Sequence, residues 1–381
     1  MKKTALVLSG GGSRGAYEIG VWKALKELDI KIDMVFGTSV GSINGALIVQ
    51  DDLELAERLW KELETDMVFD VSEEEYSFKS TFESIDLGGM SADDALSYAK
   101  EIVLNGGAGT SGLESLMYDY IDEKQVRTSG IDYGLVTTEF PSMRGAFLYV
   151  DDIPDGQLND HILASASCFP AVRKCVIGEK TYIDGGYNDN LPVQMAMDRG
   201  ATAIIAVDLQ AVGIIRKSTV DEAREKCDEF HMIKSHVDLG NFLIFDADNS
   251  KRIMTLGYLD TMRHFGKYDG LRYTFEKGQL KPHHLAGADT AAYMLKLDPC
   301  VVYNKDTVKE ALLTAVKQHE ECCDSFADYL NDDELRGQLL LYIARSLKQD
   351  EEKSMFMQPA LFRVLKEEIQ AANFLVMHNL I

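Results

Sequence analysis

A serine between two glycines is the residue of this sequence best suited to chemistry. The segment reads Gly37-Thr38-Ser39-Val40-Gly41 and fits the pattern G-x-S-x-G, in which a strand turns sharply into a helix and exposes the serine at a sheet edge. Both flanks require glycine, because the folded-back chain leaves no room for Cβ atoms. We therefore predict that Ser39 is a nucleophile; the alternative is a turn whose glycines only allow close packing.

A glycine-rich loop lies upstream of this serine, between a predicted strand and a predicted helix. It reads Gly10-Gly11-Gly12-Ser13-Arg14-Gly15 and also matches G-x-G-x-x-G, the dinucleotide-binding pattern. That pattern requires an acidic residue at the end of the second strand, whereas Asp33 stands at the start of that strand. We favour an oxyanion hole, in which glycine amides and a helix N-terminus stabilise negative charge.

A serine nucleophile needs a general base, and the histidines offer no clear candidate. None of the eight stands in a strand-end loop with glycine neighbours: His161, His231, His236, His264, His283, His284, His319 and His378. Asp184 instead ends a short apolar strand and is followed by Gly185 and Gly186, which permit close approach. A desolvated aspartate within hydrogen-bond reach of a serine can act as its base; the alternative is that Asp-Gly-Gly is only a turn.

These motifs need a sheet that presents them at one edge. Apolar spacing predicts strands at Thr4–Leu8 and Asp33–Phe36 and helices at Ala16–Leu28 and Ser39–Val49. Further strands are predicted at Tyr133–Thr137, Phe147–Val150, Ala171–Ile177, Thr181–Ile183, Ala203–Asp208 and Phe242–Phe245, and further helices at Leu53–Leu63 and Leu158–Ala166. The βαβα start predicts a three-layer α/β/α fold with a mostly parallel central sheet. Loops that follow adjacent parallel strands open at the same edge, so the glycine loop should face Ser39.

An acidic segment follows the serine motif. Residues 51–100 contain 15 acidic and 4 basic residues, a net charge of −11. This segment is expected to be a solvated excursion or, within an insert at about 51–125, a cap over the site. Gly88-Gly89 and Gly106-Gly107 would then serve as hinges.

Helical patterns dominate the end of the chain. We expect a hydrolase domain at 1–284 and a helical region at 285–381, without a sharp linker between them. A predicted helix that includes Leu361, Phe362, Leu365, Ile369 and Phe374 has an apolar face. That face suits core or oligomer packing, or contact with a membrane surface.

Composition excludes several classes of protein. The 381 residues carry a formal net charge of −23, which argues against nucleic-acid binding and against attraction to anionic membranes. Six cysteines without a C-x-x-C pair indicate a reducing compartment, and no EF-hand spacing is present. No apolar stretch reaches the ~20 residues of a membrane span. Together with the cysteine pattern, this predicts a cytoplasmic protein. Because zinc-binding and EF-hand spacings are missing, we expect no bound metal.

Together, the three motifs resemble the patatin-like phospholipase family. The family pattern is G-G-G-x-R-G, then G-x-S-x-G, then D-G-G/A. The third motif extends from Asp184 to Pro192 like the family's D-G-G-x-x-x-N-x-P, and an A-S block ending in proline resembles Ala164–Pro170. The resemblance covers about residues 4–210.

The resemblance implies a serine lipid acyl hydrolase with a Ser-Asp dyad and no cofactor. Ser39 would attack the ester carbonyl, Asp184 would take its proton, and water would cleave the acyl-enzyme. Amides of Gly11, Gly12 and Arg14 would hold the oxyanion. The supporting motif glycines would be Gly10, Gly15, Gly37, Gly41, Gly185 and Gly186. Phospholipids, lysophospholipids or other acyl lipids would be substrates; the alternatives are an acyltransferase that uses the same acyl-enzyme and a catalytically idle interaction module.

Overall fold

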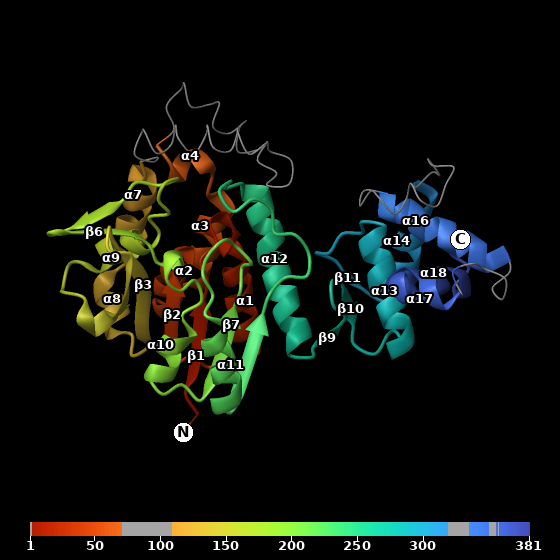
Figure 1. The fold of residues 1–381 in the computed structure, drawn as a ribbon, viewed down its shortest axis with the longest axis horizontal. Coiled ribbons are helices and arrows are strands. Elements are labelled where there is room, and N and C mark those ends of the chain that lie inside the picture. The colour runs from red at the N-terminus through yellow and green to blue at the C-terminus, as the bar shows by residue number, and fades with distance from the viewer. Residues whose placement is uncertain (1, 71–108, 319–334, 350–355, 357) are drawn as a thin grey trace. The chain divides into compact units, whose positions relative to one another are not determined.

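The computed structural model describes residues 2–70, 109–318, 335–349, 356 and 358–381. The chain forms two compact units, Met1–Tyr258 and Leu259–Ile381 (Figure 1). Among the described residues, no helix combines the length and the apolar character that crossing a membrane requires.

The first unit is built on an eight-stranded sheet with the order β5-β6-β3-β2-β1-β7-β8, in which β4 also pairs with β3. The strands are β1 (Thr4–Leu8), β2 (Met34–Thr38), β3 (Asp132–Phe140), β4 (Arg144–Tyr149), β5 (Cys175–Ile177), β6 (Lys180–Asp184), β7 (Ala203–Val207) and β8 (Glu229–Ile233). The central strands β3, β2, β1, β7 and β8 pair in parallel, whereas β4, β5 and β6 pair antiparallel. All residues of β1, β2 and β7 are buried, as expected for parallel strands covered on both faces.

Helices cover both faces of this sheet (Figure 1). They are α1 (Ala16–Glu27), α2 (Val40–Val49), α3 (Leu53–Glu62), α4 (Thr65–Val68), α7 (Ser111–Tyr120), α8 (Glu123–Thr128), α9 (Leu158–Ser165), α10 (Val193–Asp198), α11 (Lys217–Lys226) and α12 (Ala247–His264), the last of which runs into the second unit. Ala5 and Val7 of β1 pack with apolar residues of α10 and α11. Leu8 points to the opposite face, toward Gly45 of α2, because successive side chains of a strand alternate. The predicted three-layer α/β/α fold is therefore confirmed.

One predicted strand of this unit is absent, and two predicted hinges lie outside the described residues. The strand predicted at Phe242–Phe245 is wrong, because this segment is a loop and the place beside β7 is taken by β8. Its apolar side chains line a cavity instead. The proposed hinges Gly88-Gly89 and Gly106-Gly107, like most of the acidic insert, lie outside the described residues.

The second unit combines a small sheet with five described helices. Its elements are β9 (Tyr268–Asp269), β10 (Thr274–Glu276), α13 (Pro282–Met294), β11 (Val302–Tyr303), α14 (Lys305–Gln318), α16 (Arg336–Gln349), α17 (Pro359–Val364) and α18 (Lys366–Met377). Tyr273, Phe275 and Leu280 are buried in the same core as these helices. The expected domain boundary near residue 284 therefore falls inside this unit. Leu365, Ile369 and Phe374 also belong to this core, so packing accounts for most of the apolar face noted above.

Candidate active site

Two strands meet end to end along one edge of β3. Residues 134–136 of β3 pair with both β2 and β4, and residues 137–139 pair with both β6 and β4. A strand has only two edges, and β4 occupies one of them over this whole length. β2 and β6 therefore share the other edge and run toward each other.

This junction explains why Ser39 and Asp184 are neighbours. Val136 of β3 pairs with Thr38, the last residue of β2, and the next residue, Thr137, pairs with Asp184, the last residue of β6. Ser39 directly follows Thr38 in the chain. Sheet register thus brings the predicted nucleophile and the predicted base together, although they are far apart in sequence.

The backbone at Ser39 is held in a strained conformation. Its φ of 55° and ψ of −129° are unusual for a residue with a side chain. The Ser39 N–H donates to the hydroxyl oxygen of Ser165 (2.9 Å), and that hydroxyl donates to the carbonyl of Val136 (2.6 Å). Ser165 is fully buried at the end of α9. It therefore ties the turn at Ser39 to the central sheet.

The two motif glycines around Ser39 allow three backbone segments to touch. A Cβ atom on Gly37 would clash with the carbonyl oxygen of Gly41. A Cβ atom on Gly41 would lie only 2.6 Å from the carbonyl oxygen of Leu8. The spacing G-x-S-x-G thus reflects a turn packed against the end of β1, as the motif predicts.

The carboxyl group of Asp184 is buried and engaged with the serine. The residue is 5% exposed, and its side chain accepts hydrogen bonds from the Ser39 hydroxyl and from the Gly186 N–H, the latter at 2.7 Å. Burial raises the pKa of Asp184 to about 6, against the opposing effect of these two hydrogen bonds. A Cβ atom on Gly185 would clash with the carbonyl oxygen of Val136, so this glycine is required for the tight turn.

The glycine loop faces the serine. A Cβ atom on Gly10 would lie 2.9 Å from the Cβ of Ser39. Asn190 holds this glycine from both sides, because its backbone carbonyl accepts from the Gly10 N–H and its side-chain amide donates to the Gly10 carbonyl, both at 3.1 Å. The sequence places Asn190 in the longer motif Asp184–Pro192 but does not predict this contact with Gly10.

Two glycines of the loop lie on the wall of an apolar cavity next to Ser39. Gly11 and Gly12 line it, and in the described part of the chain neither N–H has a hydrogen-bond partner. The expectation for Arg14 is corrected, because its N–H donates to the Gly11 carbonyl (3.1 Å) in a 3₁₀ turn. The Arg14 guanidinium also points elsewhere and donates to the carbonyls of Gly240 and Gln210, both at 2.8 Å.

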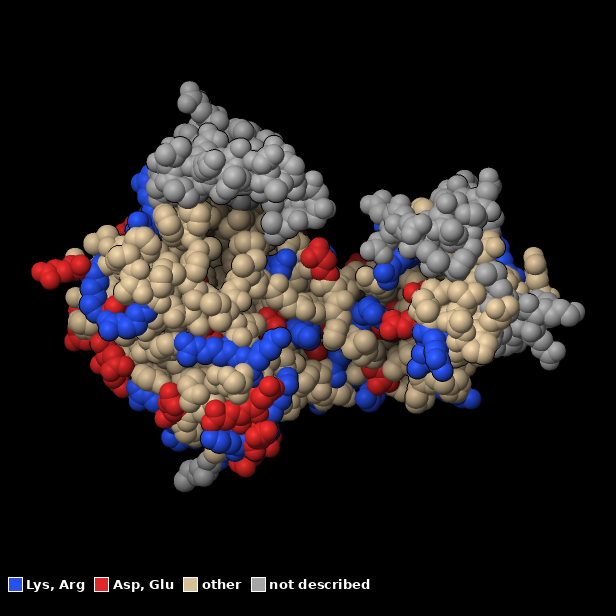
Figure 2. Space-filling model, in the orientation of Figure 1, with Lys and Arg blue, Asp and Glu red and all other residues tan. Residues whose placement is uncertain are grey.

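An apolar cavity of about 140 Å³ opens beside these groups. Gly10, Ser39 and Asp184 lie on its wall together with carbon-rich side chains from α2, α3, α7 and the 242–245 loop. Those side chains include Ile43, Leu47, Leu59, Trp60, Leu113, Leu116, Met117, Phe242, Leu243 and Phe245. No histidine among the described residues lines it. Figure 2 shows uncharged side chains around the recess on this face of the first unit.

A buried polar network lies behind the glycine loop, and no sequence motif predicted it. Asn44 of α2 donates to the Glu18 carboxyl group (2.8 Å) and to the Gly15 carbonyl (2.9 Å). The indole N–H of Trp60 donates to the Asn44 side chain (2.9 Å). Burial raises the pKa of Glu18 well above its usual range. The network links α1, α2 and α3 at the back of the cavity.

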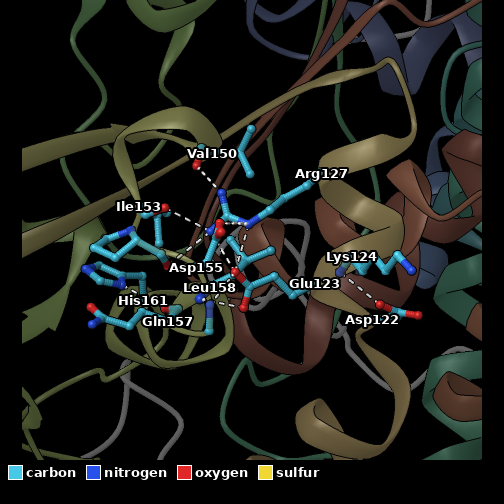
Figure 3. Close-up of polar contacts among 12 residues, drawn as sticks. Asp122, Glu123, Lys124, Arg127, Val150, Ile153, Asp155, Gln157, Leu158 and His161 are labelled. Atoms are coloured by element: carbon cyan, nitrogen blue, oxygen red, sulfur yellow. Dashed lines mark hydrogen bonds and ion pairs between the residues drawn. The ribbon is translucent and has the colours of Figure 1, made fainter.

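A second network fixes the start of α9, the helix that carries Ser165. Arg127 donates to the carbonyls of Val150 (2.8 Å) and Ile153 (2.9 Å) and pairs with Glu123 at 2.6 Å (Figure 3). The Glu123 carboxylate in turn accepts from the N–H of Leu158, the first residue of α9, at 3.3 Å. The nearby His161 ring bonds to the Gln157 carbonyl (2.8 Å), which fits a packing role.

Comparison with known proteins agrees with the motifs. A sequence model of the Patatin-like phospholipase family matches residues 6–197. Patatin-like phospholipase domain-containing protein 7 of Rattus norvegicus is 28% identical over 211 residues, 54% of this chain and 13% of that protein. Lysophospholipase NTE1 of Coccidioides immitis is 32% identical over 212 residues, 55% of this chain and 12% of that protein. The chain thus matches only a small part of these longer proteins.

Among solved structures, VipD from Legionella pneumophila aligns with 100% of this chain and 85% of its own, at 14% identity and a TM-score of 0.39. The family match is more specific. It runs from β1 into α10 and includes the glycine loop, the serine turn and the Asp184 motif. The chain therefore belongs to the patatin-like phospholipase family.

Proposed function

We propose that this chain is a serine lipid acyl hydrolase that cleaves carboxylic esters through an acyl-enzyme on Ser39. Its main support is the hydrogen bond between the Ser39 hydroxyl and the buried Asp184 carboxylate at the wall of an apolar cavity. Family membership and the lysophospholipase among the relatives favour phospholipids or lysophospholipids as substrates.

Burial makes Asp184 a better base than an exposed aspartate. Its pKa of about 6 lies nearer neutral pH than the ~3.9 of a free aspartate, yet the carboxylate is still mostly ionised at neutral pH. It takes the hydroxyl proton while the Ser39 oxygen attacks the ester carbon, and then passes that proton to the leaving alkoxide. In deacylation the same carboxylate takes a proton from water, which attacks the acyl carbon and frees Ser39.

The glycine loop supplies electrostatic stabilisation. Gly11 and Gly12 line the cavity next to Ser39, and their N–H groups would donate to the oxyanion of each tetrahedral intermediate. Donors of this kind typically contribute about 10²–10³-fold in rate. Asn190 fixes the loop through its two hydrogen bonds to Gly10, so the donors need little rearrangement during the reaction.

The cavity favours esters with an apolar acyl chain over esters of polar acids. Its walls are aliphatic and aromatic side chains from α2, α3 and α7, and each methylene group moved from water into such surroundings gains about 0.8 kcal/mol. The acyl part of an ester would therefore lie among these side chains, with its carbonyl carbon at Ser39.

Covalent labelling with a fluorophosphonate tests this proposal. We expect one adduct, on Ser39, which is lost in Ser39→Ala and formed at least about 10²-fold more slowly in Asp184→Asn. Ser142→Ala, at an exposed turn between β3 and β4, is the matched control and should react like the wild type. An adduct that persists in Ser39→Ala, or a normal rate in Asp184→Asn, would refute the dyad. Product analysis with a lysophospholipid then shows whether fatty acid is released.

A further inference from the structure

The second unit has a cavity of its own, of about 290 Å³. It lies between α13 and the α17–α18 pair, and its lining includes His283 and His284 of α13 together with Phe362, Lys366 and Met377. None of these residues takes part in the ester hydrolysis proposed above. A lining that combines basic and apolar side chains is characteristic of a ligand site.

Two imidazole rings, of His283 and His284, line this cavity, and the ring of His378 contacts that of His284. The ring centroids of His283 and His284 are 4.2 Å apart, and those of His284 and His378 are 4.9 Å apart. The Nε2 atom of His378 is buried and has no hydrogen-bond partner within the described residues. Such a nitrogen needs a partner, because an unmatched buried polar atom is costly.

The charges around these rings are positive. Burial, and after it Lys309, His284 and Lys305, lower the pKa of His378. The pKa of His284 is lowered by burial and then by His283, Lys281, Lys309 and Lys305. Within the described residues, no ion pair neutralises Lys366 of the cavity lining or the lysines that act on the two rings, which are Lys281, Lys305 and Lys309. A local excess of cations is unexpected in a chain of net charge −23.

We propose that this cavity binds an anionic phosphate group. Imidazole N–H groups and lysine ammonium groups are its donors, and the anion relieves the repulsion among them. A metal ion is disfavoured, because the lysines repel it and because the described residues include no set of three His, Cys, Asp or Glu groups placed to hold one. The apolar wall, with Phe362 39% and Met377 56% exposed, would accept the carbon part of a phosphate ester.

The experiment follows the imidazole signals of the full chain by ¹H–¹⁵N NMR during titration with sulfate and with inorganic phosphate, at constant ionic strength. Sulfate remains a dianion at every pH used, so a pH effect on its affinity reports the protein. We expect saturable shifts of the His284 and His378 signals. The affinity should rise as the pH falls through the pKa values of these rings, because the bound anion favours their protonated forms. Shifts that chloride reproduces would overturn the proposal.

Matched variants separate a site from general electrostatics. Lys366→Gln and His284→Gln should each weaken sulfate binding about tenfold, because each removes a hydrogen-bond donor from the cavity lining. Lys317→Gln removes the same charge as Lys366→Gln from an exposed position on α14, a helix that contributes no described residue to the lining, and should leave the affinity unchanged. Equal weakening in all three variants would mean nonspecific attraction and would refute the site.

Sedimentation with vesicles identifies the source of the phosphate. Phosphatidylcholine vesicles with and without phosphatidic acid are compared. If the ligand is a lipid phosphate, the chain sediments only with phosphatidic acid, and Lys366→Gln abolishes this. If the ligand is a soluble phosphate, sulfate and phosphate bind but the chain stays in the supernatant with both vesicle types. Saturable zinc binding to these histidines, with no response to sulfate, would overturn the proposal in favour of a metal site.

Discussion

The hydrogen bond from the Ser39 N–H to Ser165 gives a prediction specific to this fold. Ser165→Ala removes a hydroxyl that accepts from Ser39 at 2.9 Å and donates to Val136 at 2.6 Å. Both partners then lose their hydrogen bond in the interior, at about 1–3 kcal/mol each. The variant should therefore unfold at a lower temperature than the wild type and still fold.

The larger effect concerns the nucleophile. Ser39 has a positive φ, and such strain costs about 1–3 kcal/mol, so the turn should relax once its N–H is released. A displacement of the hydroxyl by about 1 Å can cost 10²-fold in rate. We expect fluorophosphonate labelling of Ser165→Ala to be about 10–100-fold slower, equivalent to about 1.4–2.7 kcal/mol in the barrier.

The assay is the second-order labelling rate, measured well below the unfolding temperature of every variant. Ser167→Ala is the matched control, because Ser167 is also buried, but among the described residues its hydroxyl bonds only to the Leu163 carbonyl within its own segment (2.8 Å). Ser167→Ala should lose stability without a comparable loss of rate. The reasoning is refuted if Ser165→Ala labels at the wild-type rate, or if both variants slow equally.

Four further predictions concern the same site. Because the base is the ionised form of Asp184 and burial raises its pKa to about 6, the labelling rate should rise with pH, be half-maximal near pH 6 and level off above it; a midpoint near the ordinary aspartate value of ~3.9 would contradict this. The same raised pKa means that the folded state loses stability as the pH rises from the ordinary aspartate value of ~3.9 to about 6, so Asp184→Asn should gain thermal stability relative to the wild type above pH 6 and not below about pH 4; an equal gain at both would show another cause. Gly12→Ala places a Cβ atom at a φ of 53° and against the Phe242 carbonyl, so it should slow labelling by about 10²-fold or more through the displaced amides, and a wild-type rate would exclude the glycine loop from the oxyanion hole. Leu116→Trp adds volume to the apolar wall, so esters with long acyl chains should lose activity while short ones keep it, as measured on a series of graded chain length; uniform loss would indicate that the chain lies elsewhere.

The proposed nucleophile and base could be picked out from the sequence because their motifs require unusual backbone conformations. Ser39 and Asp184 stand in turns that need glycines at fixed offsets, and such needs are visible in a single sequence. The predicted bounds of β1, Thr4–Leu8, are confirmed, because the apolar run ends where the glycine loop begins.

The residues that position this chemistry could not be predicted. Ser165 and Asn190 are residues of the family motifs, but their hydrogen-bond partners Ser39 and Gly10 lie 126 and 180 residues away in the sequence. Only the folded sheet shows these pairings. Arg127 has no motif at all. A strand was expected at Phe242–Phe245 because apolar residues cluster there, and those residues line a cavity instead of completing the sheet.

The meeting of β2 and β6 on one edge of β3 also sets an order of events during synthesis. Ser39 leaves the ribosome long before Asp184, and until β6 pairs with β3 the edge beyond Thr38 is vacant. A nascent chain that stops short of residue 184 therefore carries a serine without its base. Reactivity toward a fluorophosphonate should appear only when β6 has paired with β3 at this junction. The labelling reaction would therefore report when the first unit has completed its fold.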